Sequence, residues 1–258
     1  MRKVLVVGAL GRMGRAVRAA LELEPSLVLA AALEGKEHPE QGARLERGVP
    51  VSDDATSALA ACDVAIDFSI PSATLATASA AADARVAYVT GTTGFSKTEA
   101  AEFDALGAQI PVVRAANFSV AVNTLVWLVR AAAQRLGTGY DAEIVELHHA
   151  AKRDAPSGTA LRLADAIAEG RGAAGPVVLE RAGEVGARPA GAIGVQALRG
   201  GDNAGEHTVM FFGRGERLEL AHRANTRDHF AAGAVRVAAW LAGRAPGVYR
   251  VEQIFGLE

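Results

Sequence analysis

Short apolar runs alternate with alanine-rich stretches through the first half of the chain. Apolar runs of this length are typical of buried strands, and alanine-rich stretches favour helices. The expected strands are residues 3–7, 27–33, 64–68, 86–90 and 110–114, and the expected helices are residues 12–24, 71–83 and 97–106. This alternation predicts an α/β fold with a Rossmann-type, doubly wound parallel sheet.

The pattern changes after about residue 119. Strand follows strand there, separated by turn signals such as Gly200-Gly201, which predicts a second α+β domain with a mixed or antiparallel sheet. The expected helices are residues 120–136, 157–169 and 228–241, and the expected strands are residues 140–149, 190–198, 206–212 and 216–222. We therefore expect one domain over residues 1–119 and a second over 120–227, with residues 228–258 packing back onto the first.

Composition excludes several classes of protein. The 258 residues are 50% hydrophobic and 22% charged, an ordinary globular balance, and the net charge of -2 gives no general attraction to nucleic acid. No apolar stretch reaches the ~18 residues that span a bilayer. Cys62 is the single cysteine, so no internal disulfide can form, which suits a reducing compartment. We expect a cytoplasmic protein with neither a nucleic-acid nor a membrane partner.

Three glycines lie where the first strand passes into the first helix. Gly8, Gly11 and Gly14 form a G-x-x-G-x-x-G segment, a variant of the dinucleotide fingerprint. Glycine lets the backbone approach a pyrophosphate closely, and the helix start offers free N–H groups, to which Arg12 can add a phosphate contact. The alternative is a tight strand-to-helix connection that binds no ligand.

An acidic residue supports the dinucleotide interpretation. Glu34 ends the second strand, where a carboxylate can accept hydrogen bonds from the adenosine ribose. Gly35 follows it, where a basic residue would favour a 2′-phosphate, although Lys36 is one place further on. The sequence therefore leans to NADH without excluding NADPH. A solvated strand end is the alternative interpretation of Glu34.

Two further loops follow predicted strands, at the edge where open α/β sheets bind ligands. Their small and hydroxyl-bearing residues suit the nicotinamide end of a cofactor, although either loop could be an ordinary turn. They are Gly91-Thr92-Thr93-Gly94 and Ala115-Ala116-Asn117-Phe118.

The second domain carries the densest polar chemistry. His148 and His149 end a predicted strand and Lys152 follows, so two imidazoles and an ammonium lie close along the chain. Ser157-Gly158-Thr159 then opens a helix, whose N–H groups suit a carboxylate. This set could bind a dianionic substrate and donate a proton. Adjacent strand residues face opposite ways, so the two histidines should differ in role unless the strand ends between them.

Two other interpretations of this segment stay open. A metal site would need more ligands at suitable spacing, and the adjacent lysine opposes a cation, so we expect no metal. The histidines could also be structural residues at a strand end.

Taken together, five segments resemble the 4-hydroxy-tetrahydrodipicolinate (dihydrodipicolinate) reductase family. They are residues 8–14, 91–95, 115–120, 146–159 and 199–208, of which 146–159 is the specific one. The resemblance implies reduction of a cyclic dicarboxylate to tetrahydrodipicolinate with NAD(P)H in lysine and diaminopimelate biosynthesis. It also implies two domains and a homotetramer built through the second domain's sheet. Some relatives have arginine where this chain has Gly35, so a strong preference for NADPH is doubtful here.

The resemblance also implies roles for single residues. His148 and Lys152 would be the acid/base residues, while His149, Ser157, Gly158 and Thr159 would bind the substrate carboxylates. The cofactor residues would be Gly8, Ala9, Leu10, Gly11, Arg12, Met13, Glu34, Gly91, Thr92, Thr93, Ala115, Ala116, Asn117 and Phe118.

Two other functions remain open from the sequence. A dehydrogenase of an amino-acid semialdehyde or a sugar would share the cofactor domain but would not need His148, His149 and Lys152. A nucleotide-sensing regulator would need a DNA-binding module or a basic patch, and the sequence contains neither.

Overall fold

The apolar runs of the first half form one parallel sheet in the computed structural model, which describes residues 1–258. Its strand order is β12-β6-β5-β4-β1-β2-β3, and every neighbouring pair is parallel. The strands are β1 (Arg2–Val7), β2 (Leu27–Leu33), β3 (Val51–Ser52), β4 (Val64–Asp67), β5 (Ala87–Thr90), β6 (Pro111–Arg114) and β12 (Gly247–Tyr249). The predicted Rossmann-type sheet is confirmed.

Both faces of this sheet are covered by helices, because successive strand residues point to opposite sides. Val4 and Val6 of β1 pack with α1 (Arg12–Leu21) and α7 (Asp228–Leu241). Leu5 and Val7 face the other way. There they join a core with α2 (Ala55–Leu59), α3 (Pro71–Asp83) and α4 (Lys97–Ala105). The helix α8 (Val251–Phe255) adds Val251 and Ile254 to the first core.

The second sheet is mixed, in the order β11-β10-β7-β9-β8. Its middle strand β7 (Asp141–His148) is antiparallel to β10 (Glu206–Phe212) and parallel to β9 (Ile193–Arg199). The remaining strands are β8 (Val177–Val178), parallel to β9, and β11 (Arg217–Arg223), antiparallel to β10. The predicted mixed sheet is therefore confirmed.

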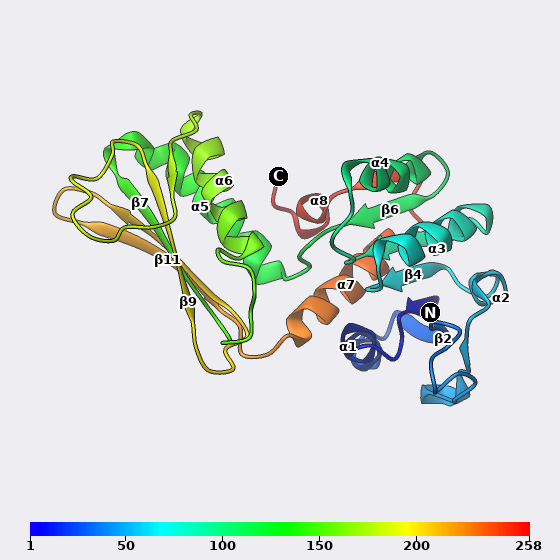
Figure 1. Ribbon diagram of the computed structural model, residues 1–258. Coiled ribbons are helices and arrows are strands. Elements are labelled where there is room, and N and C mark those ends of the chain that lie inside the picture. Colours follow the sequence, from blue (N-terminus) through cyan, green and yellow to red (C-terminus); the bar gives the residue numbers. More distant parts are fainter. The chain divides into compact units, whose positions relative to one another are not determined.

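One face of the second sheet packs against two helices, α5 (Val120–Leu136) and α6 (Gly158–Arg171), which Figure 1 shows on the same side of the strands. Val129 of α5 and Leu163 of α6 belong to this core, together with Ile144 of β7. The residues of β7 alternate between buried and half-buried along most of its length. The alternation fixes which of its side chains share a face with His148.

The chain divides into two compact units. One consists of residues 1–120 and 228–258, and the other of residues 121–227. The second unit is thus an insertion into the first along the chain. No helix of either unit is long and apolar enough to cross a membrane.

Several predicted boundaries were wrong. The strand expected over 140–149 is β7 and ends at His148, so His149 lies outside it. The helix expected over 12–24 ends at Leu21, and the strand expected over 190–198 runs from Ile193 to Arg199. The sequence interpretation missed β3, β8, β12, α2 and α8, along with the 3-10 turns Glu46–Gly48, Leu106–Ala108 and Gly137–Gly139.

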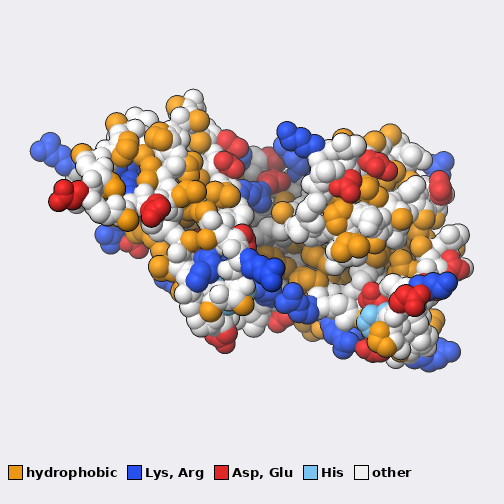
Figure 2. Space-filling view, in the orientation of Figure 1, with side chains coloured by type: hydrophobic (Ala, Val, Ile, Leu, Met, Phe, Trp, Pro, Cys, Tyr) orange, Lys and Arg blue, Asp and Glu red, His pale blue; other side chains and the backbone are white.

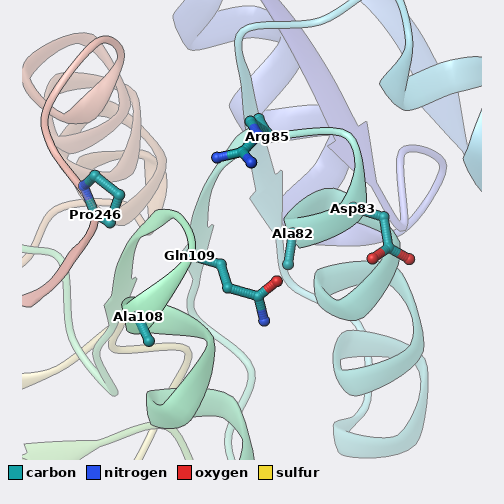
Figure 3. A pocket seen from close by; sticks show the side chains of 6 residues that line it. All are labelled: Ala82, Asp83, Arg85, Ala108, Gln109 and Pro246. Carbon is teal, nitrogen blue, oxygen red and sulfur yellow. The ribbon is translucent and has the colours of Figure 1, made fainter.

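A hollow in the first unit lies away from the ligand edge of its sheet (Figure 3). Its lining residues precede strands β5, β6 and β12 instead of following them, which places the hollow at the amino ends of these strands. They are Ala82, Asp83, Arg85, Ala108, Gln109 and Pro246. Ligands of open α/β sheets bind at the carboxyl ends, so this hollow is not the candidate site.

Candidate functional site

The predicted cofactor loops follow parallel strands of one sheet, so they meet at its carboxyl edge. The strand β1 lies between β2 and β4, where the direction of the strand order reverses. Such a reversal leaves a crevice beyond the strand ends, which is where dinucleotides bind. The loops after β1, β2, β5 and β6 therefore form one candidate binding edge.

The first loop is shaped by its glycines. Gly8 has a φ of +68°, a conformation that a side chain would strain. A Cβ on Gly14 would lie 2.1 Å from the Gly8 carbonyl oxygen, so only glycine lets α1 approach β1 this closely. Gly11 is the N-cap residue of α1, and the first N–H groups of a helix have no acceptor within it. The loop therefore presents backbone N–H groups suited to a pyrophosphate.

Glu34 joins the second strand to this loop. Its Oε2 accepts a hydrogen bond from the Leu10 N–H at 3.0 Å, and its Oε1 accepts one from the Gly35 N–H at 3.0 Å. A carboxylate has about four acceptor positions, so these two bonds leave capacity for ribose hydroxyls. Gly35 and Lys36 are exposed beside it. The glycine-rich loop after β1 and the Glu34 carboxylate together fit a nicotinamide dinucleotide.

The other two loops meet through Phe68, which follows β4. A Cβ on Gly91 would lie 2.0 Å from the Phe68 ring, so glycine is needed for the ring to lie against this loop. The Phe68 ring also contacts the Phe118 ring, edge to face, with centroids 5.9 Å apart. Thr92 is buried and its Oγ1 is 2.9 Å from Thr74 Oγ1.

Burial decides which groups of these loops can meet a ligand. The side chains of Ala9, Leu10, Thr92 and Phe118 are buried, so these residues offer their backbone. The half-buried ones are Gly8, Met13, Gly91, Ala115 and Asn117, and the exposed ones are Gly11, Arg12, Thr93 and Ala116. The Asn117 Oδ1 accepts from the Ser119 N–H at 2.8 Å, which fixes the turn after β6.

Sequence reasoning missed Asp67 at the end of β4. Its carboxyl is fully buried and accepts hydrogen bonds from the Tyr88 hydroxyl at 3.0 Å and the Ser69 N–H at 2.8 Å. Burial raises the pKa of Asp67, against the hydrogen bonds that lower it. The sequence signal that could have revealed Asp67 is an acidic residue at the end of an apolar run.

In the second unit, the His148 side chain lies on the helix-covered face of β7 with Glu146, two residues earlier. Glu146 is fully buried, and its Oε2 is 2.5 Å from His148 Nδ1. Arg199 on the neighbouring strand β9 binds both carboxylate oxygens of Glu146, each at 2.8 Å. The Ser157 N–H donates to Glu146 Oε1 at 2.9 Å. Neither Glu146 nor Arg199 was singled out from the sequence.

The loop after β7 holds Lys152 and His149 apart from this carboxylate. Lys152 Nζ is 2.8 Å from both oxygens of Asp154. The His149 Nε2 is 2.9 Å from an Arg227 nitrogen. Because β7 ends between the two histidines, each has its own partner.

The start of α6 uses the Ser157 hydroxyl for its own structure. Ser157 is the N-cap residue, and its Oγ accepts from the Ala160 N–H at 3.1 Å and lies 3.1 Å from His207 Nε2. Ser157 as a whole is buried. Gly158 and Thr159 follow in the first turn of α6, so their N–H groups, more than the Ser157 hydroxyl, suit an anion.

Burial controls the electrostatics of the two inward-facing histidines. Burial lowers the pKa of His148, and the neighbouring Glu146 opposes this while Lys152 and Arg199 add to it. Burial also lowers the pKa of His207 to about 4, with His148 contributing. Burial alone would raise the pKa of Glu146, but the bonds from Arg199, His148 and Ser157 outweigh it and lower that pKa. Glu146 is therefore ionised and His207 neutral near pH 7.

This arrangement suits proton donation beside a helix start whose N–H groups fit an anion. No group of three or more His, Cys, Asp or Glu side chains is arranged to hold a metal ion. His148 has a ring nitrogen beyond its bond to Glu146, and Lys152 provides a positive charge on the loop that follows.

Both parts of the chain match models of one family. Residues 2–118 match "Dihydrodipicolinate reductase, N-terminus" and residues 121–255 match "Dihydrodipicolinate reductase, C-terminus". Curated 4-hydroxy-tetrahydrodipicolinate reductases are similar throughout. Those of Anaeromyxobacter dehalogenans (strain 2CP-1) and Desulfotalea psychrophila are each 47% identical over 100% of this chain, and cover 98% and 99% of their own lengths.

Solved structures support the same fold. A dipicolinate-bound dihydrodipicolinate reductase from Paenisporosarcina sp. TG-14 has a TM-score of 0.79 and 25% identity, covering 97% of both chains. A scyllo-inositol dehydrogenase from Lactobacillus casei, with bound NAD(H), has a TM-score of 0.61 at 15% identity, over 100% of this chain and 94% of its own. The second likeness concerns the fold alone.

Proposed function

This chain belongs to the dihydrodipicolinate reductase family, and we propose that its two units divide the family's reaction between cofactor and substrate. The chain is an NAD(P)H-dependent oxidoreductase that reduces 4-hydroxy-tetrahydrodipicolinate to tetrahydrodipicolinate in lysine and diaminopimelate biosynthesis. The observation that carries this conclusion is 47% identity to curated reductases over the whole chain. The unit of residues 1–120 with 228–258 binds the dinucleotide, and the unit of residues 121–227 binds the substrate.

The catalytic roles fall to His148 and Lys152. The nicotinamide, when bound, would supply the hydride that reduces the substrate ring, and the 4-hydroxyl group of the substrate leaves as water. His148 gives a proton from Nε2, because its Nδ1 is engaged by Glu146. The lowered pKa of His148, caused mainly by burial, makes the protonated ring a stronger acid. The Lys152 ammonium stabilises negative charge that develops on the substrate.

The two substrate carboxylates are bound at positions of different chemistry. One meets the N–H groups of Gly158 and Thr159 at the start of α6, where the helix dipole is positive. The other meets Lys152 or the imidazole of His149, with Arg227 beside it. Ser157 contributes by capping α6 and by tying its start to Glu146. A small dicarboxylate is the substrate class that this set fits.

For the cofactor we propose a preference for NADH with tolerance of NADPH. The Glu34 carboxylate beside the first glycine loop suits ribose hydroxyls and repels a 2′-phosphate. Gly35 has no positive charge that would offset this repulsion. The nearest positive charge that follows along the chain is that of Lys36.

We also propose a cytoplasmic homotetramer assembled through the second sheet. The face of this sheet turned away from α5 and α6 carries half-buried apolar residues, including Val145, Leu147, Met210 and Phe212. Charged residues such as Glu143, which lies opposite Met210, share this face, and interfaces between subunits commonly mix apolar and charged side chains in this way. Cys62 as the single cysteine fits a reducing cytoplasm.

The direct test is a coupled assay in which the preceding aldolase generates the substrate in place. NADH and NADPH are supplied separately, and the fall of the nicotinamide absorbance is followed. We expect oxidation of both cofactors, faster with NADH at low concentration. Flat absorbance with both would refute the reductase function. Figure 2 shows both acidic and basic side chains on the visible face. A regulator that binds a nucleotide without chemistry is not favoured, because the relatives that match the whole chain are reductases.

A further inference from the structure

One buried carboxylate contacts three parts of the candidate substrate site. Glu146 accepts hydrogen bonds from the His148 ring, from the Ser157 N–H at the start of α6, and from Arg199. It is fully buried, so it contacts no substrate itself. An ionised carboxylate only accepts hydrogen bonds. The proton between Glu146 and His148 therefore belongs to His148 Nδ1.

Arg199 extends this connection to the loop that carries Lys152. Its Nη2 donates to the Asp154 carbonyl oxygen at 2.6 Å while also binding Glu146. The carboxylate of the same Asp154 binds Lys152. Arg199 thus holds the backbone of the loop against the strand that presents His148.

The other ring nitrogen of His148 faces a residue without a side chain. A Cβ on Gly205 would lie 2.8 Å from His148 Nε2, so glycine leaves this nitrogen room. Gly205 has a φ of +145°, which also favours glycine there. Its N–H donates to Asn203 Oδ1 at 2.8 Å, which orders the turn before β10.

From these contacts we propose that Glu146 and Arg199 are positioning residues that keep the Nδ1–H of His148 on Glu146, so that Nε2 is the ring nitrogen that takes up a proton from water and passes it to the substrate. The inference rests on the proposed role of His148 as proton donor. Loss of the Glu146 charge would free the ring to adopt the other tautomer and to rotate. It would also release the start of α6 and, through Arg199, the Lys152 loop.

The groups facing His148 set the expected pH behaviour. Glu146 on its own strand favours the protonated ring, whereas Lys152 on the following loop and Arg199 on β9 disfavour it. His207 on β10 contacts the ring edge to face and is neutral near pH 7. Replacing Glu146 by neutral glutamine leaves Lys152 and Arg199 unopposed. The alkaline limb of the kcat profile should then move to lower pH.

The decisive experiment compares wild type with Glu146→Gln, Glu146→Asp and Glu143→Gln. Glu143 is a matched control, because it lies on the same strand and binds Arg181 and Arg188 instead of the groups around His148. We expect Glu146→Gln to lower kcat by about 10²-fold, the size of a general-acid contribution, with a smaller change in KM. Glu146→Asp should recover part of this loss, and Glu143→Gln should match wild type.

The readout independent of activity is the ring tautomer in ¹⁵N-histidine-labelled protein, with the His148 signals assigned from a His148→Gln variant. Above its pKa, wild-type His148 should be the Nδ1–H tautomer, and Glu146→Gln should lose that tautomer. An Nε2–H tautomer in wild type would overturn the proposal even if Glu146→Gln fails to fold. So would an unchanged tautomer and kcat in Glu146→Gln. Absence of reductase activity in wild type would refute the proposed function and leave the tautomer result standing.

Discussion

The Lys152 ammonium lies 2.8 Å from both carboxylate oxygens of Asp154. The Lys152 side chain is 20% exposed and that of Asp154 is 59% exposed, so the aspartate is the more accessible partner. A substrate carboxylate that binds Lys152 replaces a carboxylate of the same charge. The ion pair thus holds the Lys152 side chain in place when no substrate is bound, and it contributes the small free energy typical of an exposed pair.

Replacing this lysine should remove most turnover. We expect Lys152→Ala to lower kcat by roughly 10²-fold or more, because a neutral methyl neither stabilises developing negative charge nor takes part in proton transfer. Steady-state kinetics with saturating cofactor measure the effect. Lys97→Ala, at an exposed position on α4, is the matched control and should behave like wild type. Near-normal turnover of Lys152→Ala would exclude the lysine from the mechanism.

The carboxylate of Glu34 should set the cofactor preference. We expect Glu34→Gln to lower kcat/KM for NADH about tenfold, since a charged hydrogen bond to the ribose is weakened. The value for NADPH should hold or rise, because repulsion of the 2′-phosphate disappears. Both cofactors are titrated at fixed substrate, with exposed Glu37→Gln as the control. An equal loss for both cofactors would contradict a role in discrimination.

The close approach of α1 to β1 should make Gly14 intolerant of any side chain. A Cβ there would lie 2.1 Å from the Gly8 carbonyl oxygen and 2.8 Å from backbone atoms of Ala9. Gly14→Ala should lower the free energy of unfolding by about 3 kcal/mol, the upper part of the range for overpacking. Denaturant unfolding measures this, with Gly35→Ala as the control, where a Cβ meets nothing within 4 Å. Equal stability of the two variants would show that the loop can open at Gly14.

The buried His207 should make stability depend on acid. Its pKa in the folded chain is lowered, mainly by burial, to about 4, whereas an unfolded chain takes up a proton below about 6.5. Protonation therefore favours the unfolded chain as the pH falls from the unfolded to the folded pKa. We expect His207→Gln to avoid about 2 kcal/mol of the wild-type loss between about pH 7.5 and about pH 4.5. Parallel stability curves of the two proteins over this range would contradict the lowered pKa.

A charge on the open face of the second sheet should weaken self-association. Met210 is half-buried in the middle of β10 on that face, so Met210→Lys would place a new charged side chain at the proposed interface between copies. Sedimentation should detect a species smaller than the wild-type assembly. Leu179→Lys alters an exposed apolar residue outside the sheet strands and should leave the assembly intact. An unchanged assembly in Met210→Lys would move the interface elsewhere.

The sequence predicted the long elements well and the polar network poorly. Apolar runs such as β2 and β10 were placed correctly, because burial on a sheet imposes its pattern on neighbouring residues. Elements such as β3 and β12 have two or three residues, too few for any periodicity. Their existence depends on the neighbouring strands β2 and β6.

The network around His148 depends on strand pairing that a sequence does not reveal. Glu146 resembles a solvent-facing residue until Arg199 is placed beside it, and the two are brought together by the register of β7 with β9. His207 enters through the register of β10 with β7. The histidines and the lysine were recognisable because they are close along the chain. Their supporting residues are distant in sequence and became visible only in the fold.

Because residues 228–258 belong to the first unit, that unit cannot finish folding until the whole chain has been synthesised. A ribosome makes β1 to β6 early, but α7 and β12 emerge only after the whole second unit. Until then the apolar face of the first sheet lacks Ala234, Val237 and Leu241, which are fully buried in the finished core. Residues 121–227 can therefore complete their fold first, although they are made second. The first unit, although most of its residues are made first, therefore keeps apolar surface exposed for the longest time. It depends most on protection from aggregation.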